Sequence, residues 1–360
     1  MPEPEVDATA TYARAKEALA GGEAGIGQLG AAAERLREIA PEIGTILGSS
    51  EVSAHLGTYA RCDEEAVRQQ SRLFWETTAA NLCLLAAAVL SSCVLAVPAI
   101  QAMLGETWTP RLLLAIGLTA LLLGALAALY GYRAREGNRL LRWLNMRGRA
   151  EVARIDTFRA IAHRAAAAGP VAAAAGLALF CRYLFLEQRD WLVGRAQRHR
   201  VSSDVTNRWG GLATALTFLG GSAATIAAFQ DKMSWLALAG VVGTAFMAFA
   251  LNREGLRRDR ANADRYEEKA VALDQLSTRL DEVAGEIAAG RPEALTAFVD
   301  QVTAELETEH KQWLDGTKQV EAALASLDAR LKELRETQPK AGPALVVPLQ
   351  EPEREPQRPG

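Results

Sequence analysis

The chain has 360 residues, of which 49% are hydrophobic and 23% are charged, and its formal net charge is −3. Its mean hydropathy of 0.00 is high for so charged a sequence, because very apolar and very polar stretches alternate along it. This segregation excludes an ordinary soluble enzyme and a mostly disordered chain as the default. The near-neutral charge offers no positive field to phosphates, so we expect no nucleic-acid partner.

Residues 1–60 are polar and of mixed charge, and they lack the basic start and apolar core of a secretion signal. Two short amphipathic helices are predicted at Thr11–Leu19 and Ala31–Ile39, followed by a linker at Pro41–Ser50. We interpret this region as an N-terminal cytoplasmic helical segment. No motif in it indicates a mechanism.

Four stretches are apolar and close to the length of about 20 residues that a membrane-spanning helix needs. They occupy residues 77–104, 111–132, 209–229 and 234–251. Short connections join the first to the second and the third to the fourth, so each pair is predicted to form a transmembrane hairpin. Burial of these helices inside a soluble protein is the alternative, and the Trp and Tyr residues at their ends favour the membrane.

Arginines indicate the orientation of the predicted hairpins. They gather at the outer ends of both hairpins, whereas the tips hold only Arg111 and Lys232. Because positively charged segments stay cytoplasmic, both termini and the middle of the chain are predicted to lie on the cytoplasmic side of the membrane. The expected fold class is all-α, an integral membrane protein with four spans and long cytoplasmic helices that form a coiled-coil-like bundle.

One further stretch, Ala165–Phe180, is uncharged and rich in alanine. It is short for a span, and a fifth crossing would place the arginines before the third span on the outer side. We therefore predict a helix packed within the cytoplasmic bundle, and contact with the membrane is the alternative.

The chain reads as two similar units, residues 61–163 and 164–316, each with a basic helix, a hairpin and a long charged helix.

Gly290 and Pro292 are predicted to end one cytoplasmic helix and start another. The second helix is expected to fold back on the first, and pairing between subunits is the alternative. Residues 317–337 would end it, and 338–360 read as a disordered Pro-rich tail. A coiled-coil-like seam precedes the break. It consists of Tyr266, Leu273, Leu276, Leu280, Val283 and Ile287.

The sequence contains no catalytic, nucleotide-binding or metal-ligand motif. Its four cysteines have no metal-binding spacing, and its four histidines are scattered. We therefore expect no enzymatic activity, no metal and no cofactor. The spans contain no Asp, Glu, Lys or His, which argues against a coupled transporter or a proton pump.

The candidate functional residues are polar or small residues within the spans. One face of the third span holds Gly210, Thr214, Thr217, Gly221 and Thr225. A polar line on the first span includes Asn81 and Ser92. These residues would either line a water-filled pore or let helices pack closely in lipid, and close packing is the commoner use of such faces.

The segment Trp143–Phe158 resembles the signature that follows the hairpin in SLATT domains, the two-span membrane domains of bacterial nucleotide-signalling defence systems. The matching positions are Trp143, Arg147, Ala150, Glu151 and Phe158. The second unit resembles a related branch of the same superfamily. The residues that carry this second likeness are Trp191, Tyr266, Glu267, Phe298, Glu309 and Trp313. The resemblance covers roughly residues 68–315, as two tandem copies.

This resemblance implies a membrane effector that perforates or depolarises the inner membrane when a partner enzyme detects infection. The partners it implies are the lipid bilayer, further copies of the chain, and a nucleotide second messenger or a protein as activator. A non-catalytic anchor that holds a soluble partner through the cytoplasmic helices is the alternative.

Overall fold

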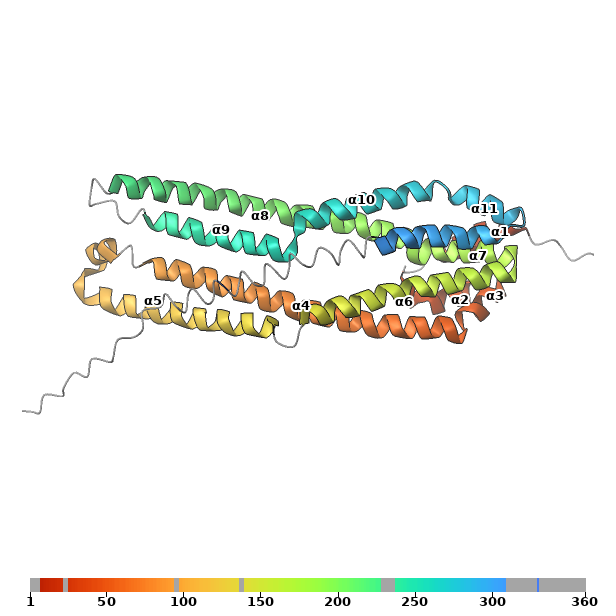
Figure 1. Ribbon diagram of the computed structural model, residues 1–360, viewed down its shortest axis with the longest axis horizontal. Helices are drawn as coiled ribbons and strands as arrows, with labels where there is room; N and C mark the ends of the chain where they lie inside the picture. The colour runs from red at the N-terminus through yellow and green to blue at the C-terminus, as the bar shows by residue number, and fades with distance from the viewer. Residues whose placement is uncertain are drawn as a thin grey trace, which may run out of the picture.

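The computed structural model describes residues 7–21, 25–93, 97–135, 139–227 and 237–308, together with residue 329. All regular structure in these residues is helical, which confirms the all-α class. Figure 1 shows an elongated molecule with two pairs of long helices at one end and a bundle of shorter helices at the other.

The chain enters the bundle through three short helices, α1 (Ala8–Ala20), α2 (Leu29–Leu36) and α3 (Pro41–Leu47). The first two confirm the predicted N-terminal helices. The linker predicted over Pro41–Ser50 is wrong because Pro41 stands at the first helical position, where its fixed φ suits a helix, and the apolar residues of α3 are buried. Ser49 then caps the next helix by accepting a hydrogen bond from the amide of Val52.

Long helices connect the bundle to the hairpins. They are α4 (Ser50–Ser92), α5 (Val97–Arg135), α6 (Arg139–Ala168), α8 (Leu186–Ala227) and α9 (Ala237–Arg257). The 43 residues of α4 extend about 65 Å at a rise of 1.5 Å per residue. Both α4 and α8 run uninterrupted from the bundle into the hairpins (Figure 1).

The first hairpin turns earlier than predicted. Helix α4 ends at Ser92 and α5 begins at Val97, so residues 97–104 belong to the second helix of the hairpin. The connection predicted at Gly105–Pro110 is helical, with Pro110 inside α5. That prediction is wrong because it used the polar residues of this segment as the sign of a turn, whereas they belong to α5.

Three helices are long and apolar enough to cross a membrane, namely Ser50–Ser92, Pro110–Ala168 and Pro170–Gly220. The first two contain most of the two predicted spans of the first hairpin. The apolar window of the third is 72% buried, because Ala172–Phe180 packs inside the bundle. The predicted third and fourth spans lie in α8 and α9, and the count of four spans stays a prediction.

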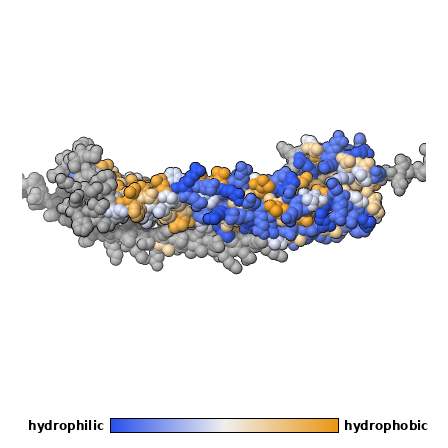
Figure 2. Space-filling model, turned by 90° about the horizontal axis from the view of Figure 1, so that it is seen from above, coloured by the Kyte–Doolittle hydropathy of each residue, from blue (hydrophilic) through white to orange (hydrophobic). Residues whose placement is uncertain are grey.

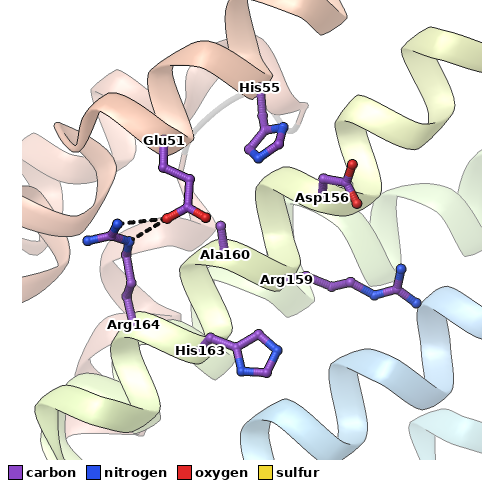
Figure 3. Close-up of a pocket in the computed structure, with 7 residues that line it drawn as sticks. All are labelled: Glu51, His55, Asp156, Arg159, Ala160, His163 and Arg164. Carbon is purple, nitrogen blue, oxygen red and sulfur yellow. Dashed lines mark hydrogen bonds and ion pairs between the residues drawn. The ribbon is translucent and has the colours of Figure 1, made fainter.

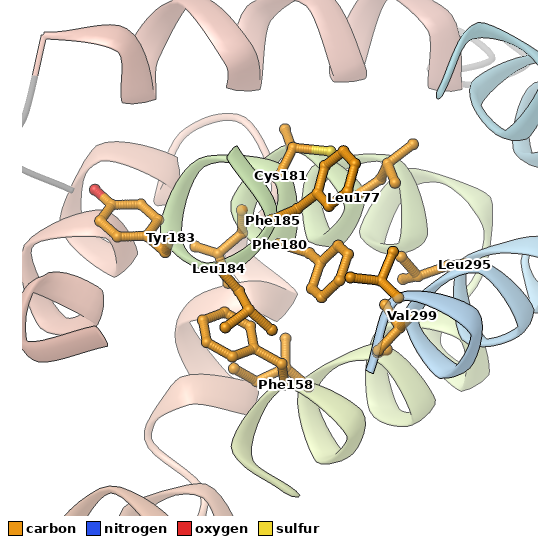
Figure 4. Packing of buried hydrophobic residues seen from close by; sticks show 14 of the residues in the cluster. Phe158, Leu177, Phe180, Cys181, Tyr183, Leu184, Phe185, Leu295 and Val299 are labelled. Carbon is orange, nitrogen blue, oxygen red and sulfur yellow. The ribbon is translucent and has the colours of Figure 1, made fainter. Parts of the chain in front are cut away.

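The alanine-rich segment forms α7 (Pro170–Phe180), followed by the π-helical turn η4 (Cys181–Phe185). Gly169, at a φ of 114°, lets the chain reverse from α6 into α7. Every residue from Ala172 to Phe180 is buried, which confirms a packed bundle helix. Figure 4 shows the surrounding core, in which the rings of Phe180 and Phe158 lie 5.9 Å apart.

The last described helices complete the bundle. They are α10 (Asp259–Ser277), α11 (Leu280–Ala288) and a helix over residues 293–308. The chain reverses at Gly290, whose φ is 83°, and Lys269 contacts Glu305 at 3.2 Å, so the predicted return of the chain is confirmed. The predicted seam is buried except for Leu280, which is partly buried. It contributes to one core shared with α1 and α7, and a separate coiled coil stays a prediction.

Candidate functional site at the junction of hairpins and bundle

The two hairpins contact each other through their inner helices, α4 and α9. At this contact the side-chain amide of Asn252 donates a hydrogen bond of 3.2 Å to Oδ1 of Asn81, and both residues are buried. A polar pair inside an apolar helix contact favours one register of the helices, because shifting them would break the hydrogen bond between the two buried amides. Asn81, predicted as a candidate residue, therefore connects the hairpins.

Within the second hairpin, α8 and α9 approach each other through glycines. A Cβ atom placed on Gly220 would overlap the backbone of Gly240, and one on Gly243 would lie 2.5 Å from the amide nitrogen of Thr217. Small residues at both positions allow this close backbone contact, which is how helices associate in lipid.

The predicted hydroxyl face of α8 lies partly on this contact. Thr214 and Thr217 each donate a 2.9 Å hydrogen bond to the carbonyl four residues earlier, so their hydroxyls are satisfied within the helix. Thr217 lies beside Gly243, and both Thr214 and Thr217 are exposed. At 100° per residue the hydroxyl face is rotated by about 70° from the line of contact with α9. Packing against α9 therefore accounts for Thr217 at one edge of the hydroxyl face, and it does not account for Thr214.

Four other candidate residues were predicted within the spans, and the structure describes the surroundings of two of them, Ser92 and Gly210. Ser92 is buried and donates a 2.7 Å hydrogen bond to the carbonyl of Ala88. Gly210 is half-buried in α8. Gly221 and Thr225 also belong to α8, but their side chains lie outside the described residues.

The signature residues of the first unit form a network at the bundle end of the first hairpin. Arg147 contacts Asp63 of α4 at 2.8 Å and Glu151 at 2.5 Å. Arg154 pairs with Glu151 and donates a 3.1 Å hydrogen bond to Gln188 of α8. Burial lowers the pKa of Arg147, but the charges of Glu151 and Asp63 outweigh it and raise that pKa. The network thus connects α4, α6 and α8.

The aromatic signature residues of the first unit pack in the two cores of the protein. The ring of Trp143 meets that of Phe74 edge-on at 5.6 Å, at the base of the first hairpin. Phe158 lies in the bundle core beside Phe180 (Figure 4). Their role in the structure is to pack helices together.

The signature residues of the second unit cluster where α8 crosses α10. The rings of Trp191 and Tyr266 meet edge-on at 5.6 Å, and the guanidinium of Arg195 stacks over Trp191 at 5.2 Å. Glu267 forms an ion pair with Arg200. Phe298 is buried beside Phe180 and Phe185. Glu309 and Trp313 lie outside the described residues.

A polar pocket of about 340 Å³ lies between α4 and α6 (Figure 3). Its lining consists of Glu51, His55, Asp156, Arg159, Ala160, His163 and Arg164. Arg164 donates two hydrogen bonds to Glu51, at 2.9 and 2.7 Å, and Arg159 contacts Asp300 and Glu307 at 3.2 and 2.7 Å. Because carboxylates already neutralise both arginines, the pocket has no free positive charge to attract a phosphate.

No group of three or more metal-ligating side chains occurs in the part of the chain that the structure describes. The buried thiol of Cys181 belongs to the bundle core, where burial raises its pKa to about 12. It is therefore a packing residue and not a reactive one.

Sequence reasoning missed a buried carboxylate at the joint between α9 and α10. Asp259 is 1% exposed, and it accepts hydrogen bonds from Ser202 at 2.5 Å and from Nδ1 of His199 at 2.7 Å. Burial raises the pKa of Asp259, but these two hydrogen bonds outweigh it and lower that pKa. The preceding Arg258 has a φ of 50°, a left-handed conformation that is rare outside glycine.

Residues 184–313 match the family model of the SMODS and SLOG-associating 2TM effector domain 1, abbreviated SLATT_1. The chain contains a SLATT domain. No curated protein and no solved structure matches the chain. The match falls on the second predicted unit, so the resemblance stated for that unit is confirmed and the tandem arrangement stays a prediction.

The SLATT domain contains the close glycine contact between α8 and α9 and the joint between α9 and α10. The glycines of the α8–α9 contact, the joint at Arg258 and the cluster around Trp191 all fall within it. The polar pocket lies before it in the sequence, and the Arg147 network, which also lies mostly before it, reaches it at Gln188. The contact between Asn81 and Asn252 therefore joins the first hairpin to the SLATT domain.

Proposed function

We propose that the protein is a membrane effector that forms or gates a pore and perturbs the inner membrane in a bacterial anti-phage, nucleotide-signalling defence system. The observation that carries the proposal is that the SLATT domain, a two-span effector domain by its description, contacts a second apolar hairpin through helices α4 and α9. The proposal is for a non-catalytic protein with four spans, and it places the bundle and both termini in the cytoplasm.

The surfaces of both hairpins support a membrane location. Large apolar side chains point outward in each of them, including Leu114 at 64% exposure, Leu122 at 61%, Phe218 at 73% and Leu251 at 61%. So much exposed apolar surface is unfavourable in water and favourable in lipid. Figure 2 shows hydrophobic residues gathered towards the hairpin end and hydrophilic residues over much of the bundle.

The contact between the hairpins supports gating. It contains one buried amide pair, Asn81 and Asn252, and interhelical hydrogen bonds in membranes are worth only about 0.6–2 kcal/mol. Such a contact can have two arrangements of similar free energy, and a ligand that binds one of them more tightly shifts the balance. In this proposal a nucleotide or protein activator binds the bundle, and further copies of the chain complete the pore.

The proposal is tested by expressing the chain in bacteria and recording membrane potential with a voltage-sensitive dye. Depolarisation on activation is expected. Replacing Thr214, Thr217 and Thr225 together by Val should weaken conduction, because it removes the hydroxyls of the proposed lining. The matched control replaces Thr119 and Thr244 by Val, since both are exposed on the other hairpin helices. Unchanged potential and growth, even with neighbouring genes and a triggering infection present, would refute the proposal.

A non-catalytic anchor is the second candidate function, and exposed valines on the bundle half of α8 favour it. Val201 is 58% exposed and Val205 is 42% exposed, ahead of the predicted span. These side chains could bind a soluble partner. The anchor hypothesis predicts that Val201→Glu abolishes capture of a partner by the full chain, while Thr214→Val has no effect on cells.

A further inference from the structure

Arginines that reach across to a neighbouring helix of the bundle contact a carboxylate of the protein there. Examples are Arg147, Arg159, Arg164, Arg189 and Arg200. The protein therefore supplies a counter-charge where arginines lie among its own helices.

Four arginines at the bundle end of the hairpins differ from these. They are Arg72 of α4, Arg133 of α5, Arg208 of α8 and Arg253 of α9, which we call the arginine collar. None of the four forms an ion pair or a hydrogen bond with a side chain in the described residues. Each membrane helix thus carries one unpaired arginine within five residues of its predicted span.

Exposed aromatic side chains flank two of the collar arginines, since Trp75 lies one helical turn from Arg72 and Trp209 directly follows Arg208. The rings of Trp75 and Tyr130 meet edge-on at 5.1 Å in the first hairpin, and Trp209 stacks on Phe246 at 5.9 Å in the second. Trp75 is 60% exposed and Trp209 is 47% exposed. Exposed Trp and Tyr residues prefer the headgroup layer of a bilayer, which places the collar among lipid phosphates.

We propose that the arginine collar binds the phosphate groups of anionic phospholipids in the leaflet that faces the bundle. A guanidinium donates two parallel hydrogen bonds to a phosphate and keeps its charge at any physiological pH. The lipid then supplies the counter-charge that carboxylates supply within the bundle. The proposal rests on the membrane location in the proposed function and is independent of whether a pore conducts.

The test uses the full chain in nanodiscs that contain phosphatidylglycerol and phosphatidylcholine in equal parts. Spin-labelled versions of the two lipids report which one occupies the protein surface. The variant carries Arg72→Gln, Arg133→Gln and Arg208→Gln, and it leaves Arg253 intact because its Nε is buried. The preference for phosphatidylglycerol should fall by about fivefold for each collar arginine removed.

A matched control carries Arg14→Gln, Arg35→Gln and Arg61→Gln. These arginines are exposed on bundle helices and their loss changes the net charge equally. The control should keep the wild-type lipid preference, and circular dichroism should show that both variants are folded. An unchanged preference in the collar variant, or an equal loss in the control, would overturn the proposal.

Competition with inorganic phosphate separates a lipid headgroup from a soluble anion. The lipid preference should survive phosphate in excess over the protein, and a preference that phosphate removes would overturn the assignment to lipid. A chain that keeps the preference yet leaves membrane potential unchanged in cells would support the collar and refute the pore.

Discussion

Asn81 and Asn252 are 171 residues apart in the sequence, and the hydrogen bond between their side chains joins the two hairpins. Asn81 lies within the first predicted span, and Asn252 follows directly on the fourth. Both amides are buried, so the strength of this bond contributes directly to the association of the hairpins.

Replacing both asparagines tests this contribution. The variants Asn81→Leu and Asn252→Leu should each lower the stability of the folded chain, because each removes the hydrogen bond between two buried amides. The double variant should be less destabilised than the sum of the two, with a coupling of about 0.5–2 kcal/mol. Unfolding in mixed micelles at increasing denaturant measures all four proteins, and strictly additive losses would contradict the contact.

Asp259→Asn should change how stability depends on pH. The pKa of Asp259 is lowered by the hydrogen bonds from His199 and Ser202, so its carboxylate stabilises the fold above the unfolded pKa of about 3.9. This contribution is lost as the pH falls through the lower folded value. The stability difference between wild type and Asp259→Asn should therefore be constant above about pH 5 and shrink in more acidic solution.

Thermal unfolding of both proteins between pH 3 and 7 measures this difference. Asp204→Asn is the control, because Asp204 is an exposed carboxylate on the same α8 helix as His199. A difference that stays constant down to the lowest pH would contradict the role assigned to Asp259.

Arg147→Ala should destabilise the bundle more than Arg164→Ala. The side chain of Arg147 is 31% exposed and contacts two carboxylates, whereas that of Arg164 is 47% exposed and contacts one. Exposed pairs contribute about 0–1 kcal/mol, and breaking a more buried network costs more because it leaves charges unpaired. Denaturant unfolding followed by circular dichroism should show a larger loss for Arg147→Ala, and equal losses would count against the network.

Gly243→Ala should disrupt the second hairpin. The added methyl group would lie 2.5 Å from the amide nitrogen of Thr217, so α8 and α9 must move apart, at a cost of about 1–3 kcal/mol. Gly117→Ala in α5 is the matched control, because a Cβ there meets nothing within 4 Å. A cysteine pair that crosslinks α8 to α9 in the wild type should react more slowly in Gly243→Ala and normally in Gly117→Ala.

Features that depend on periodicity could be predicted from the sequence. The alanine-rich α7 was placed in the bundle because its length and the positions of the arginines argue against a span. The chain reversal at Gly290 could be predicted because glycine followed by proline ends a helix. The SLATT residues Trp191 and Tyr266 were identified as a pattern, and the structure brings their rings together.

Features that depend on contacts between distant residues could not be predicted in the same way. Asp259 stands among arginines, where an acidic residue reads as part of a solvated helix face, and its burial comes from α8 packing over it. The left-handed Arg258 has no local signal, because this conformation is usually marked by glycine or asparagine. The sequence shows Asn81 as a polar residue within a span, but its partner Asn252 lies 171 residues away, directly after the fourth predicted span.

The two helices of the SLATT hairpin enter the bundle differently, and this gives them different mechanical properties. Helix α8 is continuous over 42 residues and contains both Trp191 and Thr214. Helix α9 instead meets α10 at Arg258, where a φ of 50° interrupts the helix. We expect a movement of the bundle to reach the second hairpin through α8 more directly than through α9, so the two helices would slide against each other at their glycine contact.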